Sequence, residues 1–180
     1  MKHTVKIIAS ICLVFPWLSF AQCNTAMPES TPSSDFTYLT GGMVTHNPTG
    51  LTWSRCLYGQ TLHDNGTANI FTDDTCTNTP FSRNWRQALD IAESSEFGGH
   101  TDWRVPNLKE LKSIVEYQCS SPALNTEVFP DGSSSVVWTS SPVVNYSTAS
   151  YAWFVDFDGG FDSWNYRNYS KRVRLVRSGQ

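Results

Sequence analysis

Hydrophobic residues change their spacing along this chain, and the changes mark an order of elements. Residues 43–46 and 51–53 are short β-type runs, separated by the turn-forming residues 47–50. From residue 82 the apolar positions instead recur three and four apart, which places them on one face of a helix. The pattern therefore predicts an early hairpin, followed by a helix that ends at the glycines of 98–99.

A second helix is predicted to begin at Asn107. The Asn107 side chain can accept a hydrogen bond from a backbone N–H at the helix start, and Glu110 can reach back to the Asn107 backbone. Just before this capping box, Asp102 and Arg104 flank Trp103. We expect an ion pair or a backbone-bonding pair to hold this corner.

After residue 119 the spacing of apolar residues changes to two. Residues 136–139 form one β-type run, and residues 151–157 form a longer alternating one. A turn at 158–160 then leads into a returning strand, and a last strand is expected within 171–177. Helices grouped first and antiparallel strands grouped later predict an α+β fold rather than a doubly wound sheet.

The N-terminal residues 1–21 have the pattern of a secretory signal peptide. Lys2 and Lys6 precede an apolar run at 7–18, and small residues lead to an expected cleavage after Ala21. The run is too short for a membrane span, which needs about 20 apolar residues. We therefore expect an exported protein without an integral span, located in the periplasm, on the cell surface or in the medium.

The mature chain is expected to form one domain. Residues 22–35 are rich in Ser, Thr and Pro and are predicted to form a tether, with the folded domain over 36–180. Removing Lys2 and Lys6 from the 13 basic residues leaves 11 against 16 acidic ones, a net charge of −5. This balance favours neither nucleic acid nor an anionic membrane as a partner.

Four cysteines remain once Cys12 leaves with the signal peptide. An exported protein is expected to form two disulfides, and four cysteines allow three connectivities. We favour Cys56 with Cys76, because that bond would staple the polar segment 60–80, which leaves Cys23 for Cys119. No Cys-x-x-Cys pair occurs and no His has zinc-finger spacing to a cysteine, so no metal site is predicted.

Catalytic motifs are mostly absent from the sequence. There is no Gly-x-Ser-x-Gly, no His-Glu-x-x-His, no phosphate loop and no dinucleotide fingerprint, so we expect neither an enzyme nor a cofactor. Asp156, Asp158 and Asp162 superficially suggest calcium, but they lack the EF-hand spacing and its distal Glu. We interpret them as a solvated turn and leave calcium binding open.

One aromatic and basic cluster is the most binding-like part of the chain. Aromatic faces stack on sugar rings, and guanidinium groups bind sulfate or carboxylate through two hydrogen bonds. Alternation would place Arg172 and Arg174 opposite Val173 and Leu175, and so both in solvent. The alternative is an exposed edge that shields the core, with its arginines paired to Asp. The predicted ligand-binding residues are Trp164, Tyr166, Arg167, Tyr169, Arg172 and Arg174, with Lys171 beside them.

Four short motifs in chain order resemble those of one known family. They are Thr-Gly-Leu-Thr-Trp at 49–53, Gly-Gly-His-Thr-Asp-Trp-Arg-Val-Pro-Asn at 98–107, Trp-Thr-Ser-Ser at 138–141 and Val-Arg-Leu-Val-Arg at 173–177. Over residues 43–177 the chain resembles the C-terminal domain of the Legionella collagen-like adhesin family. The residues that carry this structural signature are Trp53, Asp102, Trp103, Arg104, Pro106, Asn107, Glu110, Trp138 and Arg177.

The resemblance implies a C-type lectin-like fold, with two helices and an antiparallel sheet stapled by disulfides. It also implies a non-catalytic, adhesin-like module that binds surface polysaccharide or glycan, in particular a sulfated or acidic one. Many relatives carry Cys where Leu175 stands, so a family disulfide is absent here. The calcium-binding motifs of lectins are absent too, since Tyr166 follows Trp164-Asn165.

Two other functions stay open from the sequence. One is a protein-interaction subunit of a cell-envelope or surface assembly, whose partner is a protein instead of a glycan. The other is an enzyme of the formylglycine-generating type, a related fold that acts through reactive cysteines. The sequence does not fix the ligand or the oligomeric state.

Overall fold

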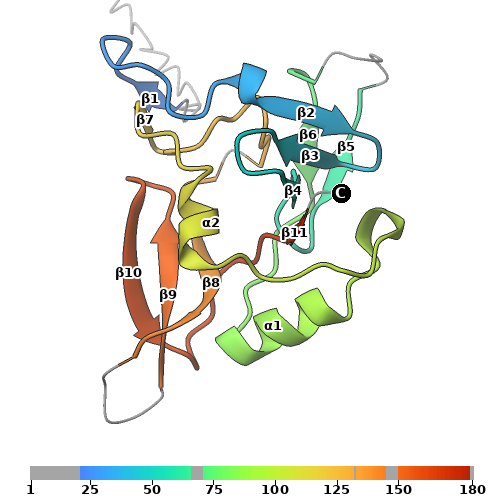
Figure 1. The fold of residues 1–180 in the computed structure, drawn as a ribbon, viewed down its shortest axis with the longest axis vertical. Helices are drawn as coiled ribbons and strands as arrows, with labels where there is room; N and C mark the ends of the chain where they lie inside the picture. The colour runs from blue at the N-terminus through green and yellow to red at the C-terminus, as the bar shows by residue number, and fades with distance from the viewer. Residues whose placement is uncertain (1–20, 66–70, 132, 145–149, 179–180) are drawn as a thin grey trace, which may run out of the picture.

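The computed structural model describes residues 21–65, 71–131, 133–144 and 150–178, and it has an α+β architecture of short strands and two α-helices (Figure 1). In chain order the elements are β1 (Gln22–Cys23), η1 (Ser33–Asp35), β2 (Phe36–Leu39), β3 (Met43–His46), β4 (Leu51–Ser54), β5 (Thr61–His63), β6 (Thr75–Thr77), α1 (Trp85–Glu93), η2 (Phe97–Gly99), α2 (Leu108–Lys112), β7 (Cys119–Ser120), β8 (Val136–Pro142), β9 (Tyr151–Asp156), β10 (Phe161–Tyr166) and β11 (Val176–Ser178).

Residues 1–20 of the expected signal peptide lie outside the described residues, so cleavage after Ala21 stays a prediction. Within the described ranges, no helix has both the length and the apolar character needed to cross a membrane.

The predicted early hairpin is confirmed as β3 and β4. Met43 lies opposite Ser54 and His46 opposite Leu51, and the connecting turn uses Gly50 at a positive φ of 67°. Two further strands complete a four-stranded sheet in the order β11-β4-β3-β2. The last strand of the chain, β11, thus returns to pair with β4, which closes the domain.

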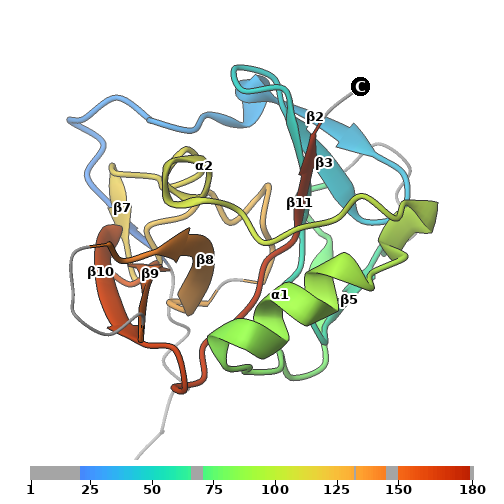
Figure 2. The same cartoon turned by 60° about the horizontal axis from the view of Figure 1, so that its bottom comes forward.

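The last strand, expected within 171–177, is only partly confirmed, because β11 covers Val176–Ser178 and residues 171–175 lie outside it. The other three strands predicted after residue 119 are confirmed. They form a three-stranded antiparallel sheet in the order β10-β9-β8, in which Trp164 lies opposite Trp153 and Tyr166 opposite Tyr151. Figure 2 shows α2 beside this sheet, with α1 near the start of β11. This arrangement leaves β10 at the margin of the molecule (Figure 1).

Both helices begin with a capping box. At α2 the Asn107 Oδ1 accepts from the Glu110 N–H at 2.9 Å, and a Glu110 carboxylate oxygen accepts from the Asn107 N–H at 2.8 Å, as predicted. Asn84 and Gln87 make the same exchange at α1. The α2 helix itself has only five residues. Its apolar stripe continues past the helix end in residues 114–115, which are fully buried.

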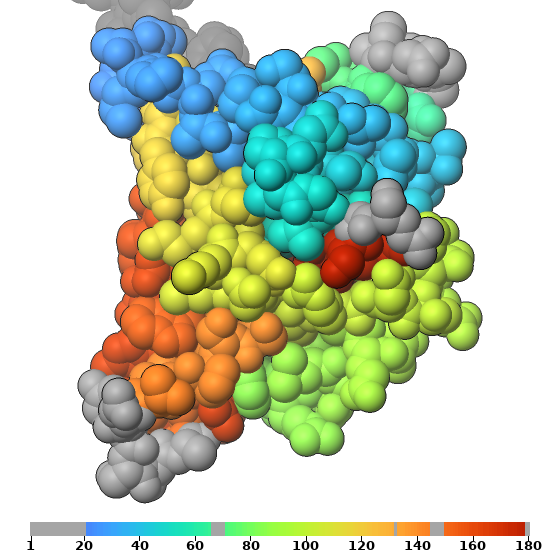
Figure 3. All heavy atoms as spheres, in the orientation of Figure 1, coloured from blue at the N-terminus to red at the C-terminus, as the bar shows by residue number. Residues whose placement is uncertain are grey.

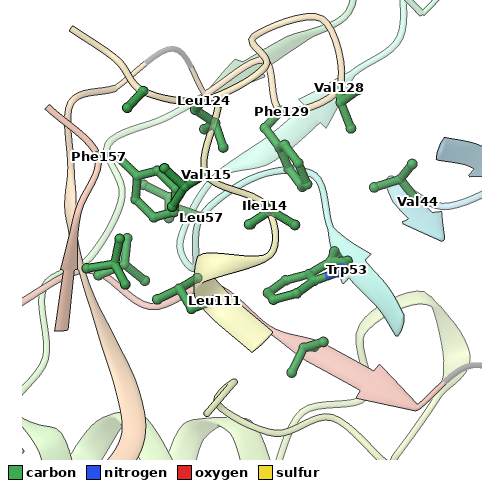
Figure 4. Close-up of a cluster of buried hydrophobic side chains, with 14 of the residues drawn as sticks. Val44, Trp53, Leu57, Leu111, Ile114, Val115, Leu124, Val128, Phe129 and Phe157 are labelled. Carbon is green, nitrogen blue, oxygen red and sulfur yellow. The ribbon is translucent and has the colours of Figure 1, made fainter. Parts of the chain in front are cut away.

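Two hydrophobic clusters form the core. In one, Leu111, Ile114 and Val115 meet the fully buried Trp53 and Phe129 (Figure 4). The other cluster lies under α1 and contains Trp103 and Trp138. The small side chains of Ala88 and Ala92 let α1 pack closely against them. Its members are Met43, Ala88, Ala92, Trp103, Val105, Trp138, Ala152, Val173 and Leu175.

The corner around Trp103 is built differently from our expectation. Asp102 and Arg104 do not pair with each other: Asp102 accepts from the Arg177 Nε at 2.7 Å, and Arg104 binds Glu110 through two bonds of 2.6 and 2.8 Å. Trp103 is 3% exposed, and its indole N–H is satisfied by a backbone carbonyl. The signature residues therefore tie α2 and β11 to the loop that precedes α2.

Both disulfides form as favoured. Cys56 pairs with Cys76 and Cys23 pairs with Cys119. The stapled segment 60–80 is more than a surface loop, because it contains the β5–β6 hairpin with Cys76 in β6.

Residues 22–35, here called the N-terminal strap, differ from the expected tether. The strap begins in β1, which pairs with β7 beside the Cys23–Cys119 bond. Further along, the buried Glu116 carboxylate accepts hydrogen bonds from Ser30 and Thr31, and Asn125 donates to the Thr31 carbonyl. Figure 3 shows the strap in blue, lying across the top of the molecule. It is thus part of the folded unit.

Candidate functional site

Four aromatic side chains from β9, β10 and the turn after β10 form a connected group, here called the aromatic surface: Tyr151, Trp164, Tyr166 and Tyr169. The Tyr151 ring centroid lies 4.9 Å from that of Trp164 and 4.4 Å from that of Tyr166, and Tyr169 follows Tyr166 at 6.2 Å. Trp164, Tyr166 and Tyr169 are 39%, 48% and 56% exposed. Three of the predicted ligand-binding residues are therefore brought together with ring area open to solvent.

Arg174 is not part of this surface. It is 1% exposed, its Nη1 donates to the carbonyls of Ser54 and Arg55 at 2.9 and 2.8 Å, and its Nη2 pairs with the buried Asp131. The expectation that alternation exposes Arg174 is wrong. Both sides of the segment around it are covered, because Val173 and Leu175 enter one core cluster while Val176 enters the other.

Four cations come from the chain that leaves β10 and from the segment that pairs with it, and they make no ion pair with a carboxylate within the described part of the chain. We call them the basic seam: Arg83, Arg167, Lys171 and Arg172. The guanidinium of Arg167 lies 4.2 Å from the Trp85 ring centroid, and its Nε donates to the Tyr151 carbonyl. Arg172 donates to the Pro80 carbonyl. Arg167 and Arg172 are partly buried.

Lys171 has the most unusual environment of the four. Its Nζ lies 4.0 Å from the Phe154 ring centroid and 5.0 Å from that of Trp138. Burial lowers the pKa of Lys171, and the negative charge of Asp156 opposes that shift. The ammonium group is therefore held on aromatic faces rather than by a carboxylate oxygen.

Backbone pairing holds the seam together. Arg83 and Lys171 exchange hydrogen bonds of 2.9 and 3.0 Å, and the Trp85 N–H donates to the Arg167 carbonyl at 2.9 Å. The chain that leads into α1 is thus bonded to the chain that leaves β10. This fixes the basic seam beside Tyr166 and Tyr169.

The three aspartates of the suspected calcium pattern have separate partners. Asp162 pairs with Lys112, Asp158 accepts from the Ser121 hydroxyl, and Asp156 accepts from the Asp158 N–H. Nowhere in the described ranges do three or more His, Cys, Asp or Glu side chains group in a way that could hold a metal ion.

A separate cleft of about 750 Å³ lies between the β2–β3 turn and β5. Arg55 lines this cleft, but all three of its guanidinium nitrogens already donate, to Asp74 and to the carbonyls of Phe71, Glu127 and Val128. The cation in the cleft is thus already paired with a carboxylate, whereas the cations of the basic seam form no ion pair among the residues that the structure describes.

Sequence reasoning missed two residues of the site. Tyr151 carried a usable signal, since it opens the alternating run of β9. Arg83 carried none, because only its pairing with Lys171, 88 positions later, places it there.

Comparison with known families matches one family model, described as the Lcl C-terminal domain, to residues 42–177. The matched range includes both helices, the aromatic surface and the basic seam, but not the N-terminal strap or β2. A search of curated proteins finds no match to the chain.

Proposed function

Because this chain belongs to the Lcl C-terminal domain family, we propose that it is an exported, adhesin-like binding module that performs no catalysis and recognises surface glycan. The family had been expected from the sequence motifs, and the match confirms it. The ligand surface in this proposal consists of the aromatic surface with the basic seam beside it.

The observation that carries the proposal is the group of exposed aromatic rings on β10 and the turn after it, in the same stretch of chain as Arg167, Lys171 and Arg172, which pair with no carboxylate among the described residues. Tyr166 and Tyr169 offer ring faces on which a sugar can stack, and Trp164 adds a larger one. The mature chain has a net charge of −5, so broad attraction to polyanions is not expected. Segregation of the cations on one seam gives an acidic sugar a local positive field despite that balance.

The arrangement of the strands supports a C-type lectin-like fold for this module. The chain combines two short helices with antiparallel strands, and its last strand returns to an early one.

A non-catalytic role is supported by the state of the cysteines. Cys23, Cys56, Cys76 and Cys119 are all joined in disulfides, whereas a formylglycine-generating enzyme requires a reactive thiol. The disulfides also fit an exported protein.

Glycan-array binding by Tyr166→Ala and Tyr117→Ala variants tests the proposal. Tyr166 and Tyr117 are 48% and 50% exposed, but only Tyr166 belongs to the aromatic surface. Loss of one stacking ring should cost about 0.5–1.5 kcal/mol, which is a two- to thirteenfold weaker affinity for Tyr166→Ala. The Tyr117→Ala variant should bind as wild type does.

The second candidate function is a protein-interaction subunit, because Tyr, Trp and Arg are also the residues enriched in protein interfaces. A pull-down from envelope extract separates the two. If no glycan binds while Tyr166→Ala abolishes capture of a specific protein, the glycan proposal is wrong and the subunit is correct.

A further inference from the structure

A polar pocket of about 240 Å³ opens at the end of the basic seam, where three chain segments meet. Four hydroxyl side chains and two cationic residues contribute to its wall, and no carboxylate does. The lining residues are Ser82, Ser134, Ser135, Val136, Ser170, Lys171 and Arg172.

The three segments are fixed by main-chain hydrogen bonds. Lys171 exchanges two bonds with Arg83, which anchors the chain around Ser82. The Arg172 N–H donates to the Val136 carbonyl at 2.9 Å, and the Arg172 carbonyl accepts from the Trp138 N–H at 3.1 Å. The pocket is therefore preorganised, so a ligand does not have to order the chain when it binds.

Most of the donors around the pocket are not used by the protein. Arg172 donates one guanidinium N–H to the Pro80 carbonyl. Its other guanidinium N–H groups have no acceptor within the described part of the chain. The hydroxyls of Ser82, Ser134 and Ser170 make no hydrogen bond to any described residue, and only Ser135 is engaged, with Ser133. Unused donors beside two cations are the chemistry of an anion site.

We propose that this pocket binds one tetrahedral oxyanion, a phosphate or sulfate group, through the serine hydroxyls, the Lys171 ammonium and the Arg172 guanidinium. Tetrahedral oxyanions present several acceptor oxygens, which suits donors that converge from three segments. A carboxylate would use only part of this donor set.

The nearest competing negative charge is Asp156. It acts on Lys171 electrostatically, but its Oδ1 accepts a hydrogen bond from the Asp158 N–H, and it forms no ion pair with either pocket cation. Arg83, the third cation nearby, adds positive charge on the side of Ser82. Lys171, Arg172 and Arg83 thus contribute three positive charges around the pocket, against the one negative charge of Asp156 that acts on Lys171.

This inference extends the proposed glycan function by naming the charged group that a ligand would carry. Inorganic anions test it separately from the glycan. Isothermal titration calorimetry of the secreted protein compares sodium phosphate and sodium sulfate with sodium chloride at matched ionic strength. We expect saturable binding of phosphate or sulfate and none of chloride.

The decisive variant is Ser134→Asp, which puts a carboxylate among the donors at an exposed position that makes no packing contact in either core cluster. Its matched control is Ser34→Asp, an exposed serine in η1 with the same change in charge. We expect Ser134→Asp to weaken anion binding at least tenfold and Ser34→Asp to leave it unchanged. Equal melting temperatures of the two variants confirm that both are folded.

Three further ligands identify the source of the anion: glucose 6-phosphate, glucose 6-sulfate and glucose. Binding of an ester supports a charged sugar, while binding of the inorganic ion alone supports a free anion. Glucose tests the aromatic surface alone, so its failure affects only the proposed function. The pocket proposal is overturned if phosphate and sulfate bind no better than chloride, or if the two Asp variants weaken binding equally.

Discussion

Glu116 should be the side chain that holds the N-terminal strap on the domain. It is 3% exposed, and its two oxygens accept hydrogen bonds from the N–H and hydroxyl groups of both Ser30 and Thr31, and from the Gln118 N–H. In Glu116→Gln one oxygen becomes an NH2 group, which faces donors instead of accepting from them. The change of shape is minimal, so the variant tests the hydrogen bonding and the charge of the carboxylate without creating a cavity.

The expected loss follows from these contacts. At least one backbone N–H and one neighbouring donor lose their acceptor, and each buried unsatisfied group costs about 1–3 kcal/mol. We expect Glu116→Gln to lower the free energy of unfolding by about 2–4 kcal/mol. The loss should not exceed about 4 kcal/mol, because the strap can then detach from the domain surface and Ser30 and Thr31 can form hydrogen bonds with water. The Cys23–Cys119 disulfide still keeps the strap covalently attached.

Urea unfolding followed by tryptophan fluorescence measures the loss, and amide exchange at Thr31 reports release of the strap. Glu127→Gln is the control, because Glu127 is exposed and accepts from the strap only through the Ser33 hydroxyl. A substitution at such an exposed position should change the free energy of unfolding by less than about 0.5 kcal/mol. If Glu116→Gln unfolds at the wild-type urea midpoint, the strap is not held by this carboxylate.

Four further outcomes are expected. Burial raises the pKa of Glu116, but the hydrogen bonds from Ser30, Gln118 and Thr31 outweigh it, so the pKa lies below the ordinary 4.5. The folded state therefore gains stability from the charged carboxylate above pH 4.5. That stability should be lost as the pH falls through the lowered pKa. A pH series of urea midpoints checks this, and Glu116→Gln should flatten it. Trp103→Ala should cost about 3–5 kcal/mol in the same assay, whereas a midpoint close to wild type would show that burial of Trp103 does not stabilise the domain. Asp131→Ala should cost about 3–5 kcal/mol by leaving buried Arg174 unpaired, and Asp131→Ala with Arg174→Met should recover part of that loss. Intact-mass analysis should find a chain that begins at Gln22 with no free thiol; a reactive thiol or a lipid on Cys23 would contradict it.

The helices and the main strands could be predicted because their signals are local. The capping box at Asn107, the helical spacing of Ala88 and Ala92, and the alternation in 151–157 each depend on residues within two turns or one strand. These local signals predict the backbone conformation of each element without any knowledge of long-range contacts. The same reasoning supplied both disulfide pairings, since one short staple leaves a single remaining pair.

What could not be predicted depends on contacts between distant segments. Alternation around Arg174 assumed one buried and one exposed face, but this stretch lies between two core clusters, so both faces are covered. The strap has the composition of a linker, and nothing near it in sequence reveals that Glu116 binds it. The basic seam likewise needs the pairing of Arg83 with Lys171.

The bond between Cys23 and Cys119 also determines how the domain bears a pull. Tension applied at Gln22, the expected first residue of the mature chain, passes through that covalent link into residue 119 and bypasses the chain from 24 to 118. If the opposing load is a ligand held on β10, the stretched path contains only the chain that leads through β8 and β9. The four-stranded sheet and both helices then lie outside the path of force, so a module fastened in this way can resist shear without straining the half of its fold that carries Trp53.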